Sequence, residues 1–247
     1  MIRKTMHNRT RSNPMEAFKK IHARALERKG GPKGLAAWLP TPKTKAQLTR
    51  IPDHRYVAEM ARCVFQAGFV WRVIDQKWPD FETVFFKFAP DKLVLLSPEQ
   101  WEAIGQDRRV VRNMQKIMSV ARNAQFVLET AEEHGSFAKL VANWPEQDLI
   151  GLLELMKKRG DRLGGVTGMR VLRNLGKDCF LLSGDVITCL KAAGLDIDKA
   201  SSKRELKLIQ ATFNQWHDET GLPYCQLSRI CSCSVGENYS AAFDEDA

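Results

Sequence analysis

The stretch that decides the fold is Leu163-Gly164-Gly165-Val166-Thr167-Gly168. Residues 146–159 before it and residues 166–175 after it both have the apolar spacing of helices. Glycines let a turn approach a phosphate closely, and the N–H groups that begin the second helix can bind an anion, which the helix dipole also favours. Such a turn positions a protein on DNA without reading bases. A glycine-rich connection between two packed helices is the commoner role of this pattern taken alone.

Helical spacing continues on both sides of this turn. The predicted helices outside it span 15–29, 55–76, 108–131, 136–143 and 184–193. Ser202 and Glu205 form a capping box that predicts the start of a last long helix. Because strand-like alternation is nearly absent, the sequence predicts an all-α protein of many short helices crossing at steep angles.

Charge is concentrated at the N-terminus. The chain has 247 residues and a formal net charge of +9, and residues 1–34 hold ten Lys and Arg but only two acidic residues. We expect 1–34 to be a basic arm, partly helical or disordered, which either binds phosphate or is simply solvated. The prolines in 35–54 predict a linker, 55–236 is expected to be the helical domain, and 237–247 an acidic flexible tail.

The sequence also predicts the cellular class. No run of about 18 apolar residues occurs, and no apolar segment follows the first charges, which argues against a membrane span and a secretion signal. The six cysteines include no CxxC pair, so we expect buried thiols rather than a disulfide framework. A cytoplasmic protein is the expectation.

The glycine-rich turn resembles that of a known superfamily. Leu163 to Thr167 is similar to the helix-hairpin-helix turn of base-excision DNA glycosylases, Leu-Pro-Gly-Val-Gly, with Gly164 and Thr167 replacing its proline and second glycine. Many of these enzymes have a catalytic aspartate where this chain has Ser183. Bifunctional members have a lysine nucleophile where this chain has Met169, so the resemblance implies a monofunctional enzyme.

Three further stretches resemble the DNA-3-methyladenine glycosylase I family. They are Gln66-Ala67-Gly68 with Trp71, Arg112-Asn113 with Lys116-Ile117 and Asn123-Ala124, and Lys157-Lys158-Arg159-Gly160. Their order and spacing agree with the family over roughly residues 55–195. The resemblance implies a two-lobed, all-α helix-hairpin-helix DNA glycosylase fold, with a base flipped into a pocket between the lobes. It also implies a monomer that acts on duplex DNA containing alkylated bases, in the cytoplasm and associated with the nucleoid.

The chain departs from this family at several places. The base-recognising glutamate of the family is replaced by Cys63, and the nearest counterpart of its N-terminal pocket block is the stretch 51–56. The family binds zinc through two Cys and two His. Only Cys189 matches that set, and Asp185 replaces the partner His. We therefore expect no zinc and no other cofactor.

Five residues are candidates for the substrate pocket. Trp71 is the expected stacking platform for a flipped base, with a core position as the alternative. Gln66 either hydrogen-bonds the base edge or caps a turn, and Tyr56 is a possible second stacking face. Glu59 lies four residues before Cys63 and returns a carboxylate to the pocket, unless it is a surface charge. Asp185 either supplies negative charge near the sugar or N-caps the helix that follows it.

A second group of residues is predicted to contact DNA. The turn residues Gly164, Gly165 and Thr167 and the cations Lys157, Lys158 and Arg159 are expected on the DNA side, although such a charge run is also typical of a solvated face. Arg112, Lys116 and Asn123 share helical spacing and either contact phosphate or tie the lobes together. Asn123 is expected to hydrogen-bond inside the protein.

The resemblance and the chemistry together predict an N-glycosylase for a cationic base. N3-methyladenine is cationic in DNA and leaves as a neutral molecule, so its glycosidic bond is weak and needs little general acid. Flipping, stacking and stabilisation of an oxocarbenium-like sugar then suffice, which accounts for Ser183 at the position of the usual aspartate. The alternatives are a DNA-binding protein of the same fold without catalysis, and a glycosylase for a different lesion.

Overall fold

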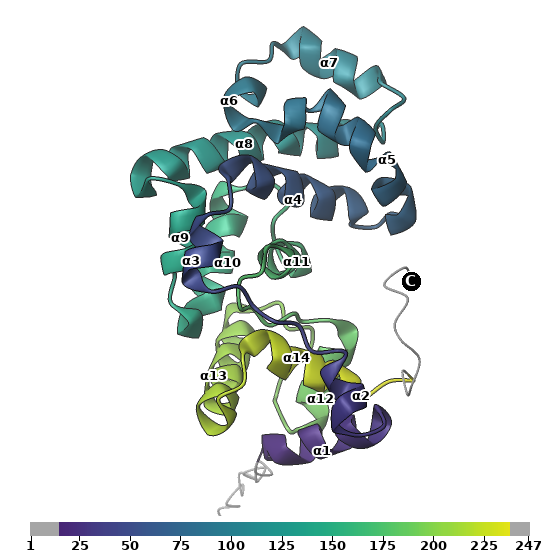
Figure 1. Cartoon of the computed structure of the whole chain (residues 1–247), viewed down its shortest axis with the longest axis vertical. Helices are drawn as coiled ribbons and strands as arrows, with labels where there is room; N and C mark the ends of the chain where they lie inside the picture. Colours follow the sequence, from purple (N-terminus) through teal and green to yellow (C-terminus); the bar gives the residue numbers. More distant parts are fainter. Residues whose placement is uncertain (1–14, 238–247) are drawn as a thin grey trace, which may run out of the picture.

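The computed structural model describes residues 15–237, and within that range every regular element is helical. The helices are α1 (Phe18–Arg28), α2 (Pro32–Ala36), α3 (Lys45–Thr49), α4 (Asp53–Gln66), α5 (Trp71–Val84), α6 (Pro90–Leu93), α7 (Pro98–Gln106), α8 (Met114–His134), α9 (Phe137–Asn143), α10 (Leu149–Arg159), α11 (Val166–Leu175), α12 (Gly184–Ala192), α13 (Lys203–Thr220) and α14 (Tyr224–Cys233), with the 3-10 helices η1 (Phe86–Phe88) and η2 (Glu146–Asp148). Figure 1 shows α4 to α8 as one lobe and α1, α2 and α12 to α14 as the other, with α11 between them. The prediction of an all-α, two-lobed fold is confirmed.

The N-terminal helix α1 belongs to the folded body. Phe18 and Ile21 are buried, and the Phe18 ring packs 5.1 Å from that of Trp216 in α13. Arg24 forms a bidentate ion pair with Glu16. The predicted basic arm over 1–34 is helical in α1, as one of its alternatives has it, and the apolar face of α1 is buried against the C-terminal lobe. Whether the arm binds phosphate stays a prediction. Residues 1–14 lie outside the described part of the chain, as does all but Glu237 of the predicted tail.

The predicted linker at 35–54 is also more ordered than expected. Thr44 and Gln47 form a capping box that begins α3, and Leu48 of α3 is buried. Figure 1 shows α3 lying beside α9. The segment that contains the prolines is packed against the rest of the protein, so it belongs to the folded body instead of forming a flexible linker. The capping box at Ser202 and Glu205 is confirmed at the start of α13.

The single helix predicted at 55–76 is two helices. Gly68 adopts a φ of +68°, a backbone conformation that ends α4 and lets the chain turn into α5. As a result Trp71 is the first residue of α5 instead of lying one turn beyond Ala67 on α4. The helix predicted at 108–131 begins only at Met114, because the Asn113 side chain caps it by accepting from the N–H of Lys116.

The loop between α10 and α11 is fixed by an asparagine from α8. The Asn123 side chain is buried, accepts from the Asp161 N–H at 2.8 Å and donates to the Asp161 carbonyl at 3.1 Å. Arg122 adds an ion pair to the Asp161 carboxylate at 2.6 Å. Gly168 completes the packing, because a Cβ there would lie 2.5 Å from the carbonyl oxygen of Leu163. The expectation that Asn123 hydrogen-bonds inside the protein is confirmed.

We predict that Asn123→Ala destabilises the protein by about 1–3 kcal/mol, because two backbone groups of Asp161 lose their buried partner. Urea unfolding followed by circular dichroism measures this change. Gln125→Ala on the exposed face of the same helix is the matched control and is expected to change stability by less than about 0.5 kcal/mol. Equal stability of the two variants would contradict the role given to Asn123.

Candidate functional site

The hairpin places the start of α11 at the protein surface. Gly165 is the N-cap, is exposed and has a φ of +59°. It has no side chain to cap the helix, so the first N–H groups of α11 are available to an anion. Gly164 lies beside the Lys157 side chain, and Thr167 is half-buried in the first turn of α11. This geometry suits a phosphate, as the sequence predicted for the turn, and contact with DNA stays a prediction.

The three cations at the end of α10 have different environments. Lys157 and Lys158 are exposed beside the turn. Arg159 instead binds Glu133 through two hydrogen bonds of 2.7 and 2.8 Å, and its guanidinium lies 5.3 Å from the centroid of the Phe126 ring. Glu133 raises the pKa of Arg159 by this hydrogen bonding. Arg159 is therefore removed from the predicted DNA-contacting set, because its donors tie α10 to α8.

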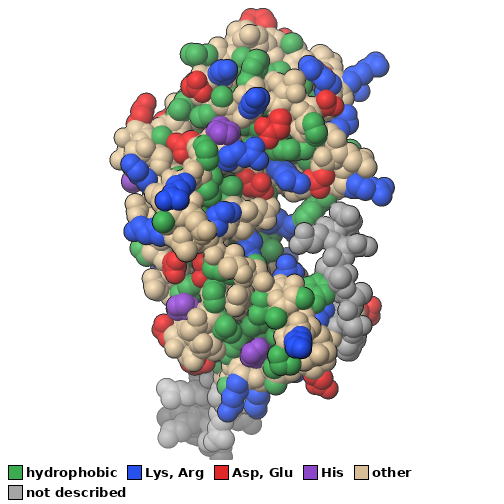
Figure 2. All heavy atoms as spheres, in the orientation of Figure 1, with side chains coloured by type: hydrophobic (Ala, Val, Ile, Leu, Met, Phe, Trp, Pro, Cys, Tyr) green, Lys and Arg blue, Asp and Glu red, His purple; other side chains and the backbone are tan. Residues whose placement is uncertain are grey.

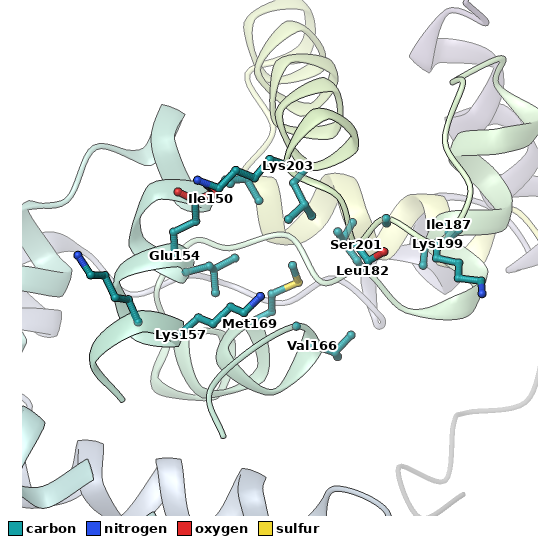
Figure 3. A pocket seen from close by; sticks show the side chains of 15 residues that line it. Ile150, Glu154, Lys157, Val166, Met169, Leu182, Ile187, Lys199, Ser201 and Lys203 are labelled. Atoms are coloured by element: carbon teal, nitrogen blue, oxygen red, sulfur yellow. Dashed lines mark ion pairs between the residues drawn. The ribbon is translucent and has the colours of Figure 1, made fainter. Parts of the chain in front are cut away.

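A groove of about 600 Å³ opens beside the hairpin (Figure 3). Its apolar lining comes from α10, α11, α12 and α13 and includes Ile150, Met169 and Leu206. Four lysines surround this apolar surface, namely Lys157, Lys158, Lys199 and Lys203. Lys203 lies 3.7 Å from the carboxylate of Glu154. The groove adds positive charge to the side of the C-terminal lobe that carries the turn.

Lys116 has a structural role. Its ammonium donates to the carbonyls of Phe65 and Ala67 at 3.1 and 2.7 Å, which satisfies the last turn of α4. Burial lowers the pKa of Lys116. It therefore joins α8 to α4 within one lobe, and contact of Lys116 with phosphate stays a prediction. Arg112 is exposed and shares a shallow depression with Glu99 and Glu102 of α7.

Trp71 lies at the junction of α5 and α11. Its ring is partly exposed, and the guanidinium carbon of Arg170 lies 4.2 Å from the ring centroid. Arg170 is on α11, one turn after its first residue. Burial lowers the pKa of Arg170. Trp71 is therefore a platform at the meeting point of the lobes, already engaged by a planar cation.

A carboxylate–thiol–amide cluster lies next to this platform. The Glu59 carboxylate accepts from the Cys63 thiol at 3.4 Å and from the Asn174 amide at 2.7 Å. Asn174 follows Arg170 by one turn of α11, so both side chains reach toward α4. Burial, and then the charge of Glu59, raises the pKa of Cys63 well above its usual range. The thiol is therefore neutral at pH 7, and the charge at this position belongs to Glu59.

Gln66 is directed toward a second carboxylate. Its amide donates to the Asp75 carboxylate at 3.2 Å, and the same oxygen accepts from Nε of Arg62 at 3.0 Å. Arg62 also lies 5.6 Å from the centroid of the Trp78 ring. Gln66 is buried, and these contacts join α4 to α5 around the chain reversal at Gly68. Its contact with a base edge stays a prediction.

Two predicted pocket residues lie elsewhere. Tyr56 is fully buried and packs 5.0 Å from the Phe137 ring, so its ring is closed to a substrate and the predicted stacking role is wrong. Ser183, rather than Asp185, caps α12 by accepting from the Val186 N–H. The Asp185 carboxylate lies beside Gly236, after the end of α14.

Arg170, Asn174 and Asp75 are site residues that the sequence motifs do not predict. The four-residue spacing of Arg170 and Asn174 was visible in the sequence, but only the packing of α11 on α4 shows that this face meets Trp71 and Glu59. Asp75 was hidden because 55–76 was taken as one continuous helix. A break at Gly68 would have placed it one turn into a new helix, where it can face back toward Gln66.

Charge on the surface is mixed. In the view of Figure 2, Lys and Arg side chains are spread over both lobes and interspersed with Asp and Glu.

Within residues 15–237 no helix has the length and apolarity needed to cross a bilayer. The described chain contains no cluster of three or more His, Cys, Asp or Glu able to hold a metal ion.

Comparison with known proteins identifies the family. The model of the methyladenine glycosylase family matches residues 52–201, more than half of the chain. The chain belongs to this family. It is similar to DNA-3-methyladenine glycosylase 1 of Escherichia coli (strain K12), with 22% identity over 50% of this chain and 74% of that protein. It is also similar in structure to 3-methyladenine DNA glycosylase I from Staphylococcus aureus, with 18% identity, a TM-score of 0.47, and coverage of 62% of this chain and 91% of the other. A crystal structure of another 3-methyladenine DNA glycosylase I gives 20% identity and a TM-score of 0.45 over 57% of this chain and 84% of the other.

The hydrogen bond between Asn174 and Glu59 predicts that a carboxylate at position 174 makes the stability of this family member depend on pH. In Asn174→Asp two carboxylates face each other at hydrogen-bond distance, so they repel when both are ionised and share a proton in acid. We expect this variant to lose about 0.5–1 kcal/mol of stability between pH 5 and pH 8, relative to wild type, since the site is partly exposed.

Thermal melts at the two pH values measure this loss. Asn174→Ala removes the amide without adding charge and is expected to show the pH dependence of wild type. A common pH dependence for Asn174→Asp and Asn174→Ala would show that the Glu59 carboxylate does not face position 174.

Proposed function

We propose that this protein is a monofunctional DNA glycosylase that excises 3-methyladenine or a related cationic alkylated base from duplex DNA. Its family supports the class of reaction, and the names of its relatives supply the base. The observation that carries the proposal for this chain is the stacking of a planar cation, the Arg170 guanidinium, on Trp71. A ring face that holds one planar cation offers the same cation–π attraction to a cationic base.

The chemistry proposed at this site is modest. The bond between C1′ of the sugar and the base nitrogen breaks, and its electron pair stays with the cationic base, which leaves neutral. Water adds to C1′ and releases a proton to solvent. Because the leaving group needs no proton, the site has to hold the base and stabilise positive charge on the sugar. Met169 is buried in α11, at the position where bifunctional relatives of this superfamily carry their lysine, so no covalent sugar–enzyme intermediate is proposed.

Glu59 is proposed as the residue that stabilises this positive charge. Asn174 and Cys63 both donate to its carboxylate, which fixes its orientation next to α11. Asp75 is already bound by Arg62 and Gln66, so its charge is compensated locally. Asp185 is proposed only as a more distant negative charge, since it lies beside Gly236.

Two further features support action on a flipped base in a duplex. Phe69 and Val70, in the turn just before Trp71, are exposed large apolar residues at 42% and 62% of their full accessibility. Apolar side chains presented in this way can insert between base steps and hold the helix open. Gly164, Gly165 and Thr167, with Lys157 and Lys158, are proposed to bind the DNA backbone near the same lobe junction. A monomer acting on nucleoid DNA in the cytoplasm is proposed on the resemblance alone.

We predict that Trp71→Ala lowers the release of labelled 3-methyladenine from methylated duplex DNA by about 10- to 100-fold, because loss of base stacking costs about 1–3 kcal/mol. Trp71→Phe keeps an aromatic face and should retain most of the activity. No release by wild type, with duplex binding intact, would instead favour a DNA-binding protein or a glycosylase for a different lesion.

We predict that Glu59→Gln lowers the single-turnover rate of base release by about 100-fold, the size expected for one preorganised electrostatic group. Glutamine keeps an oxygen that can accept from Asn174, so the site loses charge without losing its shape. Binding of substrate DNA, measured by fluorescence anisotropy, is expected to change less than threefold. A full rate in Glu59→Gln would remove Glu59 from the chemistry.

A further inference from the structure

Arg170 is in an unusual environment for an arginine. It is partly buried between the two lobes, and its guanidinium lies over the Trp71 ring at 4.2 Å. Among the described residues no carboxylate forms an ion pair with it, and burial lowers its pKa. A guanidinium is normally paired with a carboxylate or phosphate when it is taken out of water. The indole face is therefore its main partner in this structure.

We propose that Arg170 is an internal occupant of the base-stacking site, which any incoming base has to displace. The guanidinium is flat, delocalised and cationic, as an N3-alkylated adenine in DNA is. An incoming base must displace it from Trp71. A neutral base offers stacking alone, whereas a cationic base offers stacking together with the cation–π attraction that Arg170 loses. Displacement of Arg170 weakens the binding of every base by the same factor, so a neutral base, which lacks the cation–π attraction, is left with the weaker binding.

The position of Arg170 on α11 makes this displacement local. Arg170 lies one turn after the helix start at the hairpin and one turn before Asn174, which is engaged with Glu59. The arginine side chain can leave the ring by rotation of its own bonds, while α11 and the Glu59–Asn174 contact stay in place. This inference rests on the proposed function for the identity of the base, but the occupancy of Trp71 by Arg170 can be tested without DNA.

The test uses two small probes, the methylguanidinium ion and free 3-methyladenine, titrated by calorimetry into wild type, Arg170→Ala and Arg72→Ala. Arg72 is an exposed arginine next to Trp71 in sequence and is the matched control. We expect Arg170→Ala to bind methylguanidinium at least about tenfold more tightly than wild type or Arg72→Ala does. This factor corresponds to a wild-type site that Arg170 leaves open in about one molecule in ten. Binding of 3-methyladenine should tighten by a similar factor, and adding Trp71→Ala to Arg170→Ala should abolish both gains.

The outcomes separate this inference from the proposed function. Equal binding of methylguanidinium and of 3-methyladenine by wild type and Arg170→Ala would overturn the inference, while 3-methyladenine binding by both would leave the proposed function standing. A gain for methylguanidinium with no 3-methyladenine binding in any variant would support Arg170 as the occupant and count against the proposed base. Thermal melts check that Arg170→Ala is folded, and Arg170→Gln replaces it if it is not.

Discussion

The packing of α11 between the two lobes is the constraint on which the rest of the site depends. Its first N–H groups lie at the surface turn, and its middle and end pack on α4. At about 1.5 Å of rise per residue, Arg170 lies about 6 Å along the axis from Val166, and Asn174 about 6 Å further. An anion at the hairpin and a group stacked on Trp71 are therefore held at a fixed separation. The two hydrogen bonds from Asn123 to the Asp161 backbone hold the loop between α10 and α11 in place. Gly168 allows the close approach of α11 to the Leu163 carbonyl.

Local sequence signals predicted the helices well but not their junctions. The hairpin, the Ser202–Glu205 capping box and the helix at 166–175 follow from caps, glycines and apolar spacing, which act within a few residues. The break at Gly68 was missed because apolar spacing continues across it. For α1 the apolar spacing predicted a helix over 15–29, but its packing on the C-terminal lobe depends on contacts that are distant in the sequence.

The candidate site was partly predictable for a related reason. Trp71, Glu59 and the turn glycines were found from motifs and spacing along one segment. Arg170 and Asn174 come from a helix about 100 residues away in sequence, and their importance depends on contacts across the lobe junction. Burial overturned the role predicted for Tyr56, whose ring is closed off inside the protein. Lys116 and Arg159 are only partly buried, but Lys116 is bound by backbone carbonyls at the end of α4 and Arg159 by Glu133. Residue type alone cannot distinguish a cation that binds a phosphate from one that caps a helix.

Where the resemblance places a glutamate this chain has Cys63, and the proposed role of Glu59 would keep a negative charge near that position. Glu59 lies one helical turn earlier, about 5–6 Å away along α4, and Cys63 donates a hydrogen bond to it. The pKa of Cys63 is held high by burial and by Glu59, so the thiol adds no second charge. Arg62 and Asp75 form an ion pair of their own, so their charges are compensated locally. The Trp71 ring already holds the guanidinium of Arg170 on its face. The same face therefore favours a cationic ligand, whether the cation belongs to the protein or to a damaged base.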